Sequence, residues 1–355
     1  MTAVATKRQL PVLSVSGMKA AQRCYKIYLL GYVLRMRALV TSDALAFGTL
    51  FHLALEIWWL CRKLGMRGDD LLTQTILHLR EKATEAETGP FDLVKALALI
   101  TGYHYRWDSD TSEVIAVEAE FTTALTNPET GAASRTWILG GKIDVILREE
   151  NGGDLFNMEH KTTSEDVSPG SVYWRRLALD AQVSTYVEGA RSLGYDVKKT
   201  TYDVISKPRI QPKLATPEEK RKYTQITKKE PISRLYAGQR EFDETPDEYG
   251  ERIMQEIADF PNEYFARVDV PRSAEDLLDA KADAWAMGRS ISDAIKLNRW
   301  PRNPDNCEKF GSYCQYFAVC TKTASINDPY LYKHVPSTMD PQPEAPTQEP
   351  QGVAI

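Results

Sequence analysis

The stretch that decides the fold lies at residues 140–162 and reads GGKIDVILREENGGDLFNMEHKT. Two segments of strand-like alternation flank the turn signal NGGD at 151–154, and this pattern predicts a β-hairpin. Tight antiparallel pairing through that turn places Asp144 of the first strand beside Glu159 of the second. Because alternate residues of a strand share a face, we expect Glu159 and Lys161 to project together.

Two neighbouring carboxylates and a lysine give this hairpin its chemistry. Mg²⁺ and Mn²⁺ prefer oxygen ligands and would offset the repulsion between Asp144 and Glu159. Lys161 adds a compact positive charge beside an attacking water or a scissile phosphate. An acid-x-lysine triplet also arises by chance at the exposed end of a strand. The aspartate at a matching distance and the nearby glycine pair 140–141 favour metal-dependent phosphodiester hydrolysis over that reading.

The pattern on either side of the hairpin predicts an α/β fold with a central mixed sheet flanked by helices. Helical periodicity is expected at 14–37, 42–64, onward to about 107, and again at 180–193, 246–260 and 273–297. Strands are expected at 113–125, 136–148, 155–161 and 201–206. We expect one domain over 1–334, with the polar segment 207–248 as an insertion or loop, and a disordered Pro-rich tail at 335–355.

Composition limits the class of protein. With 43% hydrophobic and 26% charged residues, the chain is typical of a soluble globular protein. No apolar run approaches the roughly 20 residues that span a bilayer, and no signal-peptide pattern opens the chain, so we expect a cytoplasmic protein without a membrane partner. The net charge of −5 does not suggest a nucleic-acid binder, but it does not report on a local groove. Basic runs occur at 175–176, 207–213, 220–222 and 228–229.

The cysteines form a second candidate site. Cys24 lies near the start of the chain, and Cys307, Cys314 and Cys320 lie together near its end, among aromatic residues. Four thiolates can hold a [4Fe–4S] cluster or a structural Zn²⁺. The alternative is that the three late cysteines have no ligand role. We expect Cys61 to pack in its helix as a small apolar residue.

The order of motifs resembles the RecB-type branch of the PD-(D/E)XK nucleases. The matching motifs are Gly48-x-x-x-His52, Gly141-x-x-Asp144, Glu159-x-Lys161-Thr162 and Gln182-x-x-x-Tyr186. The resemblance covers roughly residues 14–325 and implies a restriction-endonuclease-like core.

The resemblance also implies a role for each matching residue. The metal ligands would be His52, Asp144, Glu159 and the backbone carbonyl of His160. Lys161 would be the catalytic lysine. Gln182 would position DNA or a metal-bound water, and Tyr186 would pack or orient beside Gln182. Either Glu118 or Glu120 would add a further carboxylate. The family more often has an apolar or aromatic residue where His160 stands, and we expect that side chain to point away from the metal.

A subset of this family, including AddB and the CRISPR adaptation nucleases, carries one cysteine before the nuclease core and three after it. In that subset the four cysteines hold a [4Fe–4S] cluster that pins the chain ends together. Cys24, Cys307, Cys314 and Cys320 reproduce this order, although the wider spacing between Cys307 and Cys314 leaves Zn²⁺ open.

The implied activity is Mg²⁺- or Mn²⁺-dependent hydrolysis of DNA. The chain would be an exonuclease on single-stranded DNA or DNA ends, similar to phage exonucleases, in recombination, repair or phage DNA metabolism. No Walker-type segment is present, so a helicase motor would be supplied by a partner protein. A recombination protein is the other expected kind of partner. The alternatives are a non-catalytic DNA-binding or scaffolding subunit and a restriction-type endonuclease.

Overall fold

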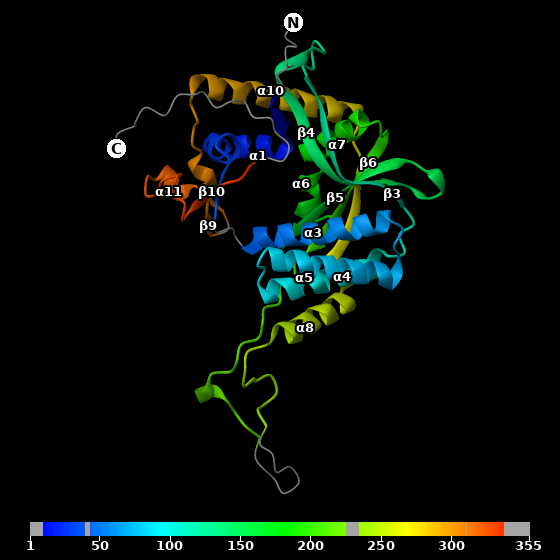
Figure 1. Cartoon of the computed structure of the whole chain (residues 1–355), viewed down its shortest axis with the longest axis vertical. Coiled ribbons are helices and arrows are strands. Elements are labelled where there is room, and N and C mark those ends of the chain that lie inside the picture. Colours follow the sequence, from blue (N-terminus) through cyan, green and yellow to red (C-terminus); the bar gives the residue numbers. More distant parts are fainter. Residues whose placement is uncertain (1–9, 40–42, 225–233, 310, 337–355) are drawn as a thin grey trace, which may run out of the picture.

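The computed structural model describes residues 10–39, 43–224, 234–309 and 311–336. Within these residues the centre is a mixed six-stranded sheet in the order β1-β4-β5-β6-β7, with β3 also paired to β4 (Figure 1). The strands are β1 Val12–Ser14, β3 Glu113–Thr126, β4 Ala133–Arg148, β5 Leu155–Thr163, β6 Val197–Ser206 and β7 Phe265–Val270. The predicted α/β architecture with a mixed sheet is confirmed.

β4 has three neighbours, and this arrangement positions the site. β3 runs antiparallel along one edge of β4. The other edge is shared, because β1 pairs with it in parallel as far as Gly140 and β5 pairs with it antiparallel from Val145 onward. Residues 141–144 therefore have no strand partner on that edge among the described residues, and β4 and β5 fork there.

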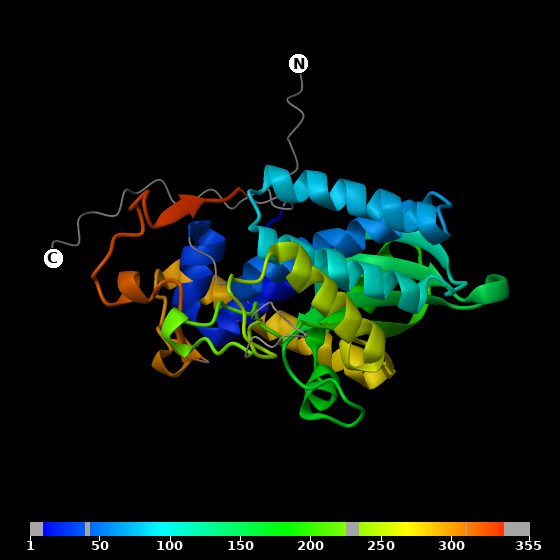
Figure 2. The same ribbon diagram turned by 90° about the horizontal axis from the view of Figure 1, so that it is seen from below.

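Helices cover both faces of the sheet (Figure 2). One layer contains α3 Asp43–Lys63, α4 Gly68–Glu85, α5 Pro90–Trp107 and α8 Pro246–Asp259. Its apolar side chains pack with Val145 and Leu147 of β4. The other layer contains α1 Val15–Arg23, α7 Ala181–Ser192 and α10 Ala274–Leu297, and α7 packs with Ile143 and Ile146. Both α8 and α10 begin with a capping box, which explains why these helices start where they do.

The predicted continuous helix at 14–37 is wrong. α1 ends at Arg23, and Cys24 has extended backbone, with φ −172° and ψ 123°. The remainder comprises α2 Tyr25–Tyr28, a π-helical segment Leu29–Val33 and β2 Met36–Ala38. β2 pairs with β10 Tyr332–His334, and Lys26 N donates to Pro301 O. The break is therefore stabilised by contacts to the far end of the chain, which local periodicity cannot reveal.

Several smaller elements were not predicted. These are α6 Val172–Leu177, α9 Pro261–Tyr264, β7, and the short C-terminal elements β8 Glu308–Lys309, β9 Ser312–Tyr313, α11 Phe317–Cys320 and β10. The polar insertion ends slightly earlier than predicted, because α8 already begins at Pro246. Of the predicted tail, all but residues 335–336 lies outside the described residues. No helix in the described ranges is long and apolar enough to cross a membrane.

Candidate active site

The fork between β4 and β5 holds the first acidic residue. Asp144 lies just before β5 joins β4, and its Oδ2 accepts a hydrogen bond of 2.8 Å from the backbone N–H of His160. Continuing the register from the pair Val145 and Met158 places Asp144 across from Glu159. The aspartate thus spans the point at which the strands separate.

Glu159 is the centre of a tight hydrogen-bonded group. Lys161 Nζ donates to Glu159 Oε1 at 2.5 Å and to Gln182 Oε1 at 3.0 Å. Gln182 Nε2 donates to the same Glu159 oxygen at 2.6 Å. Gln182 is in the first turn of α7, where its own N–H is capped by Asp180. The N-terminus of α7 is therefore docked onto the end of β5.

The second oxygen of Glu159 is available to a ligand. Oε2 is buried and has no hydrogen-bond partner among the described residues. Burial raises the pKa of Asp144, and burial together with the charge of Asp144 raises the pKa of Glu159, while Lys161 opposes both shifts. A buried acceptor without a donor is costly, and a cation would relieve the cost. The donor set of two carboxylates fits Mg²⁺ or Mn²⁺, which favour oxygen ligands.

His52 approaches this group from α3. Its ring lies edge-on to that of His160, with centroids 6.5 Å apart. Burial, followed by electrostatic repulsion from His160 and Lys161, lowers the pKa of His52 to about 3, so its imidazole is neutral. A neutral imidazole is the form that binds metal. One turn earlier, a Cβ at Gly48 would lie 3.3 Å from Thr162 Oγ1, so glycine lets α3 lie close to β5.

These residues do not form a ready-made coordination shell. Across the described ranges, no three His, Cys, Asp or Glu side chains are arranged to hold a metal ion. Instead, the ammonium of Lys161 occupies one oxygen of Glu159, and the backbone of His160 occupies one oxygen of Asp144. The roles of His52, Asp144 and Glu159 as metal ligands stay predictions.

Of Glu118 and Glu120, the structure places Glu118 nearer to Asp144. Glu118 forms an ion pair with Lys142, and its charge contributes, after burial, to the raised pKa of Asp144. Glu118 also adopts a positive φ of 53°, which is uncommon for a residue with a side chain. Glu120 is exposed. Glu118 is therefore the carboxylate near the site, and Lys142 is a neighbouring cation that sequence reasoning missed.

The His160 side chain faces away from Gln182 and joins a buried charge network. It stacks on the Trp59 ring at a centroid distance of 6.2 Å, and its Nδ1 lies 3.0 Å from Asp203 Oδ2 without hydrogen-bond alignment. Asp203 also accepts from Tyr103 Oη at 2.6 Å and from Arg267 Nε at 3.2 Å. This network supports the reverse side of the strand that carries Glu159 and Lys161, and sequence reasoning missed it because β6, β7 and α5 contribute one member each.

Tyr186 and Gly141 are linked by close packing. The Tyr186 ring meets Phe121 edge-on at 5.8 Å, and a Cβ at Gly141 would lie 2.9 Å from Tyr186 Cε1. Burial, and then the charge of Glu159, raises the pKa of the Tyr186 hydroxyl. Tyr186 therefore packs beside the acidic pair, and glycine at position 141 makes room for it.

The four predicted cluster cysteines lie together although one is far from the others in the sequence. Cys24, Cys307, Cys314 and Cys320 line one small cavity, alongside Tyr316 and Phe317. The amide of Cys314 donates to the carbonyl of Cys307 at 2.8 Å, and Asn303 and Asn306 donate to the carbonyl of Arg23. Burial raises the pKa of the Cys314 and Cys320 thiols. Cys61 is separate: it is part of α3 and is buried in the core.

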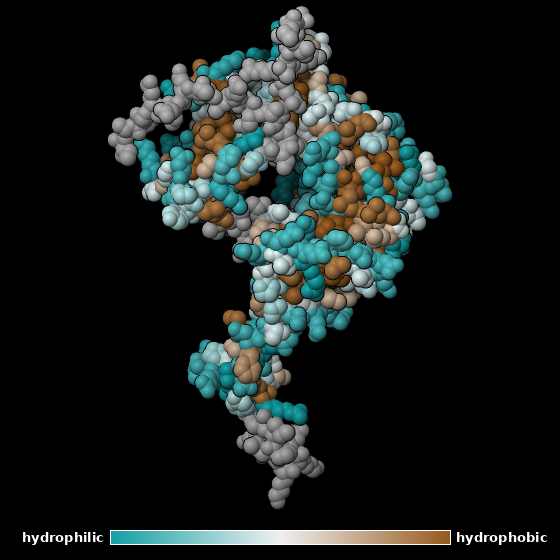
Figure 3. All heavy atoms as spheres, in the orientation of Figure 1, coloured by the Kyte–Doolittle hydropathy of each residue, from teal (hydrophilic) through white to brown (hydrophobic). Residues whose placement is uncertain are grey.

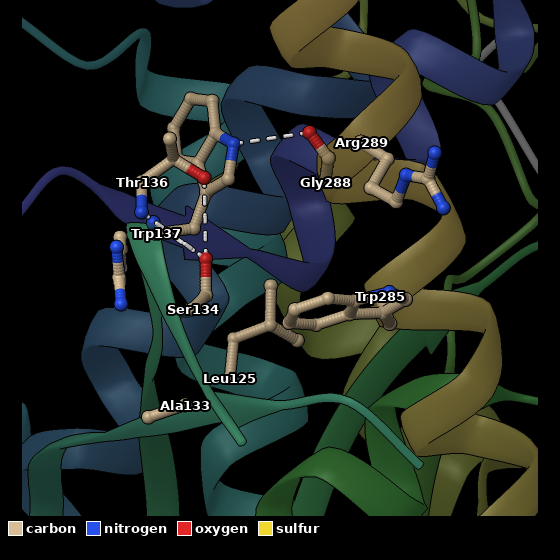
Figure 4. A pocket seen from close by; sticks show the side chains of 9 residues that line it. Leu125, Ala133, Ser134, Thr136, Trp137, Trp285, Gly288 and Arg289 are labelled. Atoms are coloured by element: carbon tan, nitrogen blue, oxygen red, sulfur yellow. Dashed lines mark hydrogen bonds between the residues drawn. The ribbon is translucent and has the colours of Figure 1, made fainter. Parts of the chain in front are cut away.

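A larger pocket lies away from the acidic group. Trp137, Trp285 and Arg289 line a cavity of about 350 Å³ between β4 and α10, and Trp137 Nε1 donates to Gly288 O (Figure 4). Its lining contains no carboxylate, so it has none of the metal-binding chemistry of the fork.

A buried acid pair beside a lysine at the fork of a mixed sheet offers the donor groups that a metal-dependent phosphodiesterase would use. The chain belongs to the PD-(D/E)XK nuclease superfamily, whose sequence profile matches residues 12–321. The predicted superfamily is therefore confirmed, and nucleases of this superfamily typically use Mg²⁺ or Mn²⁺. The RecB-type branch and the iron–sulfur subset stay predictions.

Other comparisons add little. A search of curated proteins finds no match to this chain. Fourteen chains of solved structures match. One of them, titled "Crystal structure of SSO0001", is 13% identical, with 72% of this chain and 82% of that chain covered and a TM-score of 0.29.

Proposed function

We propose that this protein is a DNA exonuclease that depends on Mg²⁺ or Mn²⁺ and acts on single-stranded DNA or DNA ends. The observation that carries the proposal is Glu159: its carboxylate is buried, one oxygen is held by Lys161 and Gln182, and the other oxygen has no partner among the described residues. A structural glutamate is normally satisfied on both oxygens when buried. The missing partner supports a cation as the ligand.

Each residue of the group has a distinct task in this proposal. Asp144 and Glu159 hold the cation, with His52 beside them as a neutral nitrogen ligand. The cation, when bound, supplies Lewis-acid activation of the attacking water. Lys161 stabilises the negative charge that develops on the phosphate. Gln182 fixes the direction of the Lys161 ammonium and of Glu159 Oε1, since it contacts both.

We also propose that Cys24, Cys307, Cys314 and Cys320 bind a [4Fe–4S] cluster. Their shared cavity and four soft thiolate donors support a metal group. Zn²⁺ bound by the same four thiolates is the alternative group for this cavity.

Two other functions remain as alternatives. A non-catalytic DNA-binding or scaffolding subunit, working with a helicase or recombination protein, would not need Lys161 and Gln182 to converge on Glu159. A restriction-type endonuclease would keep this group but would cut within a strand. The convergence favours catalysis over scaffolding, and the substrate test below separates the two kinds of nuclease.

The test is a cleavage assay with four DNA substrates: linear single strands, circular single strands, linear duplexes and closed circular duplexes. Each is incubated with Mn²⁺, with Mg²⁺ or with EDTA. The proposal expects metal-dependent degradation of linear single strands or of duplex ends, with the circles left intact. Cleavage of the circles would replace the exonuclease by an endonuclease. No cleavage of any substrate by correctly folded, metal-loaded protein would favour the scaffolding alternative.

A further inference from the structure

The described residues 207–224 and 234–245, called the arm below, project from the body between β6 and α8 (Figure 1). The outgoing and returning segments of the arm are joined by backbone hydrogen bonds of 2.8–2.9 Å along its described length. These run from Glu244 N to Lys213 O, Thr216 N to Arg240 O, Tyr236 N to Lys222 O and Thr224 N to Arg234 O. The arm is thus an extended ribbon that is held together by its backbone.

The base of the arm is fixed to α8. Glu244 is buried, and its carboxylate accepts from Arg252 Nε and Nη2 at 2.8 and 2.7 Å and from Lys213 N at 2.7 Å. Tyr249 Oη donates to Ile210 O, and Arg252 donates to Gln211 O. These bonds tie both chain directions to one helix, so the arm leaves the body in a defined direction.

The arm starts at the candidate active site. Lys207 N donates to Thr163 O at 2.8 Å, and Arg209 donates to Ser164 O at 3.0 Å. Thr163 lies two residues after Lys161 on β5. The Lys207 ammonium lies over the Phe47 ring of α3, and a Cβ at Gly48, one turn before His52, would lie 4.0 Å from Lys207 Nζ. A ligand leaving the fork along the end of β5 would therefore meet the base of the arm.

The charge of the arm is opposite to that of the whole protein. Residues 207–245 contain ten Lys and Arg and six Asp and Glu, a formal charge of +4, whereas the whole chain carries −5. The ammonium groups of Lys220 and Lys222 form no hydrogen bond or ion pair with any residue that the structure describes. Such cations are available to phosphate groups.

Aromatic and aliphatic side chains are exposed among these cations. Tyr223 and Tyr236 are each 50% exposed, and Phe242 is 74% exposed. Figure 3 shows the arm standing clear of the body, with hydrophobic residues scattered among hydrophilic ones on its surface. No apolar core explains these side chains, because none of the core clusters found in the described residues includes one of them.

We propose that the arm binds single-stranded DNA and guides it to or from the fork; this rests on the proposed nuclease function, which supplies DNA as the ligand. Lysines interleaved with exposed aromatic rings match the general chemistry of single-strand binding, in which cations contact phosphates and rings stack on unpaired bases. In a duplex the base faces are stacked inside the helix, so duplex DNA would contact the arm through the lysines alone.

The proposal is tested by fluorescence anisotropy with a 30-nucleotide single strand in EDTA, where no cleavage can occur. The double variant Y223A/Y236A should lose affinity at least tenfold, since each removed ring takes away one stacking contact with a base. The double variant K220A/K222A should weaken binding and make it less sensitive to salt. Matched controls Y330A and K296A remove exposed side chains of the same type elsewhere and should bind as the wild type.

The arm proposal and the nuclease proposal can be refuted separately. In cleavage kinetics with the same strand, Y223A/Y236A should raise KM and leave kcat unchanged, and its loss of duplex affinity should be smaller than its loss of single-strand affinity. Arm variants that bind and cut like the wild type would overturn the arm proposal and leave the nuclease intact, as would equal losses for duplex and single strand. Wild-type protein that binds single strands through the arm but cuts no DNA with Mn²⁺ would overturn the nuclease instead.

Discussion

Asp203 is the residue whose replacement tests the architecture under the site most sharply. It is fully buried on β6, with 0% of its surface exposed, and contacts Tyr103, Arg267 and His160. Arg267 is mostly buried, with 12% of its side chain exposed, and has a second carboxylate partner in Asp110, at 2.6 Å. Asp203→Asn keeps the shape of the side chain and removes its charge, so the change isolates the electrostatic contribution.

The expected destabilisation follows from the charge left behind. Removing one partner of a buried ion pair costs about 3–5 kcal/mol, because the other charge stays buried. Asp110 still neutralises Arg267 in part, so we expect the lower end, about 3 kcal/mol. At roughly 2–4 °C per kcal/mol for a large domain, this corresponds to a fall in melting temperature of about 6–12 °C.

The assay is urea unfolding at pH 7, followed by circular dichroism, with thermal melting as a second measurement. The matched control is Asp196→Asn, which removes an exposed aspartate paired with Lys198 and should leave the free energy of unfolding almost unchanged. A loss below about 1 kcal/mol for Asp203→Asn would refute the reasoning, because Arg267 would then not depend on that charge.

Three further predictions concern packing, pH and the cysteines. Gly141→Ala should cost about 1–3 kcal/mol of unfolding free energy in a urea titration, because the added Cβ overpacks against Tyr186 and Phe121. The pKa of Glu244 is lowered to about 2, chiefly by hydrogen bonds from Arg252, so Glu244 stabilises the fold above its unfolded pKa of about 4.3 and loses this effect as pH falls toward 2. The difference in melting temperature between wild type and Glu244→Gln should therefore be largest near neutral pH and disappear at about pH 2–3. A difference that does not change with pH would contradict this. Anaerobically purified protein should be brown with about four irons per chain. Cys314→Ser should lose the iron and melt at a lower temperature, whereas Cys61→Ser should keep the iron content and melting temperature of the wild type. One zinc and no iron in elemental analysis would overturn the cluster.

The hairpin could be predicted from the sequence because its information is local. Strand alternation, a two-glycine turn and the spacing from Asp144 to Glu159 all lie within 23 residues. The register follows from the turn, so the neighbourhood of the two acids follows as well. The helix at 43–63 was likewise predictable, since its apolar periodicity is continuous.

The remainder could not be predicted because it depends on contacts between distant segments. The break at Cys24 is fixed by the C-terminal segment near Pro301, and Asp203 meets Tyr103 across 100 residues. Glu118 and Glu120 look alike in the sequence, and the unusual backbone of Glu118 beside Lys142 separates them. The arm was visible only as a polar, basic stretch, since its cross-strand bonds have no periodic signature.

The measurement that tests the central claim most directly is single-turnover cleavage of single-stranded DNA with Mn²⁺, by wild type, Lys161→Ala, Glu159→Gln and the exposed-lysine control Lys296→Ala. The account predicts that both site variants cut about 10²-fold more slowly or worse, that the control cuts like the wild type, and that circular dichroism shows all four proteins folded. Folded Lys161→Ala and Glu159→Gln proteins that cut at the wild-type rate would contradict the assignment of the fork as the catalytic centre.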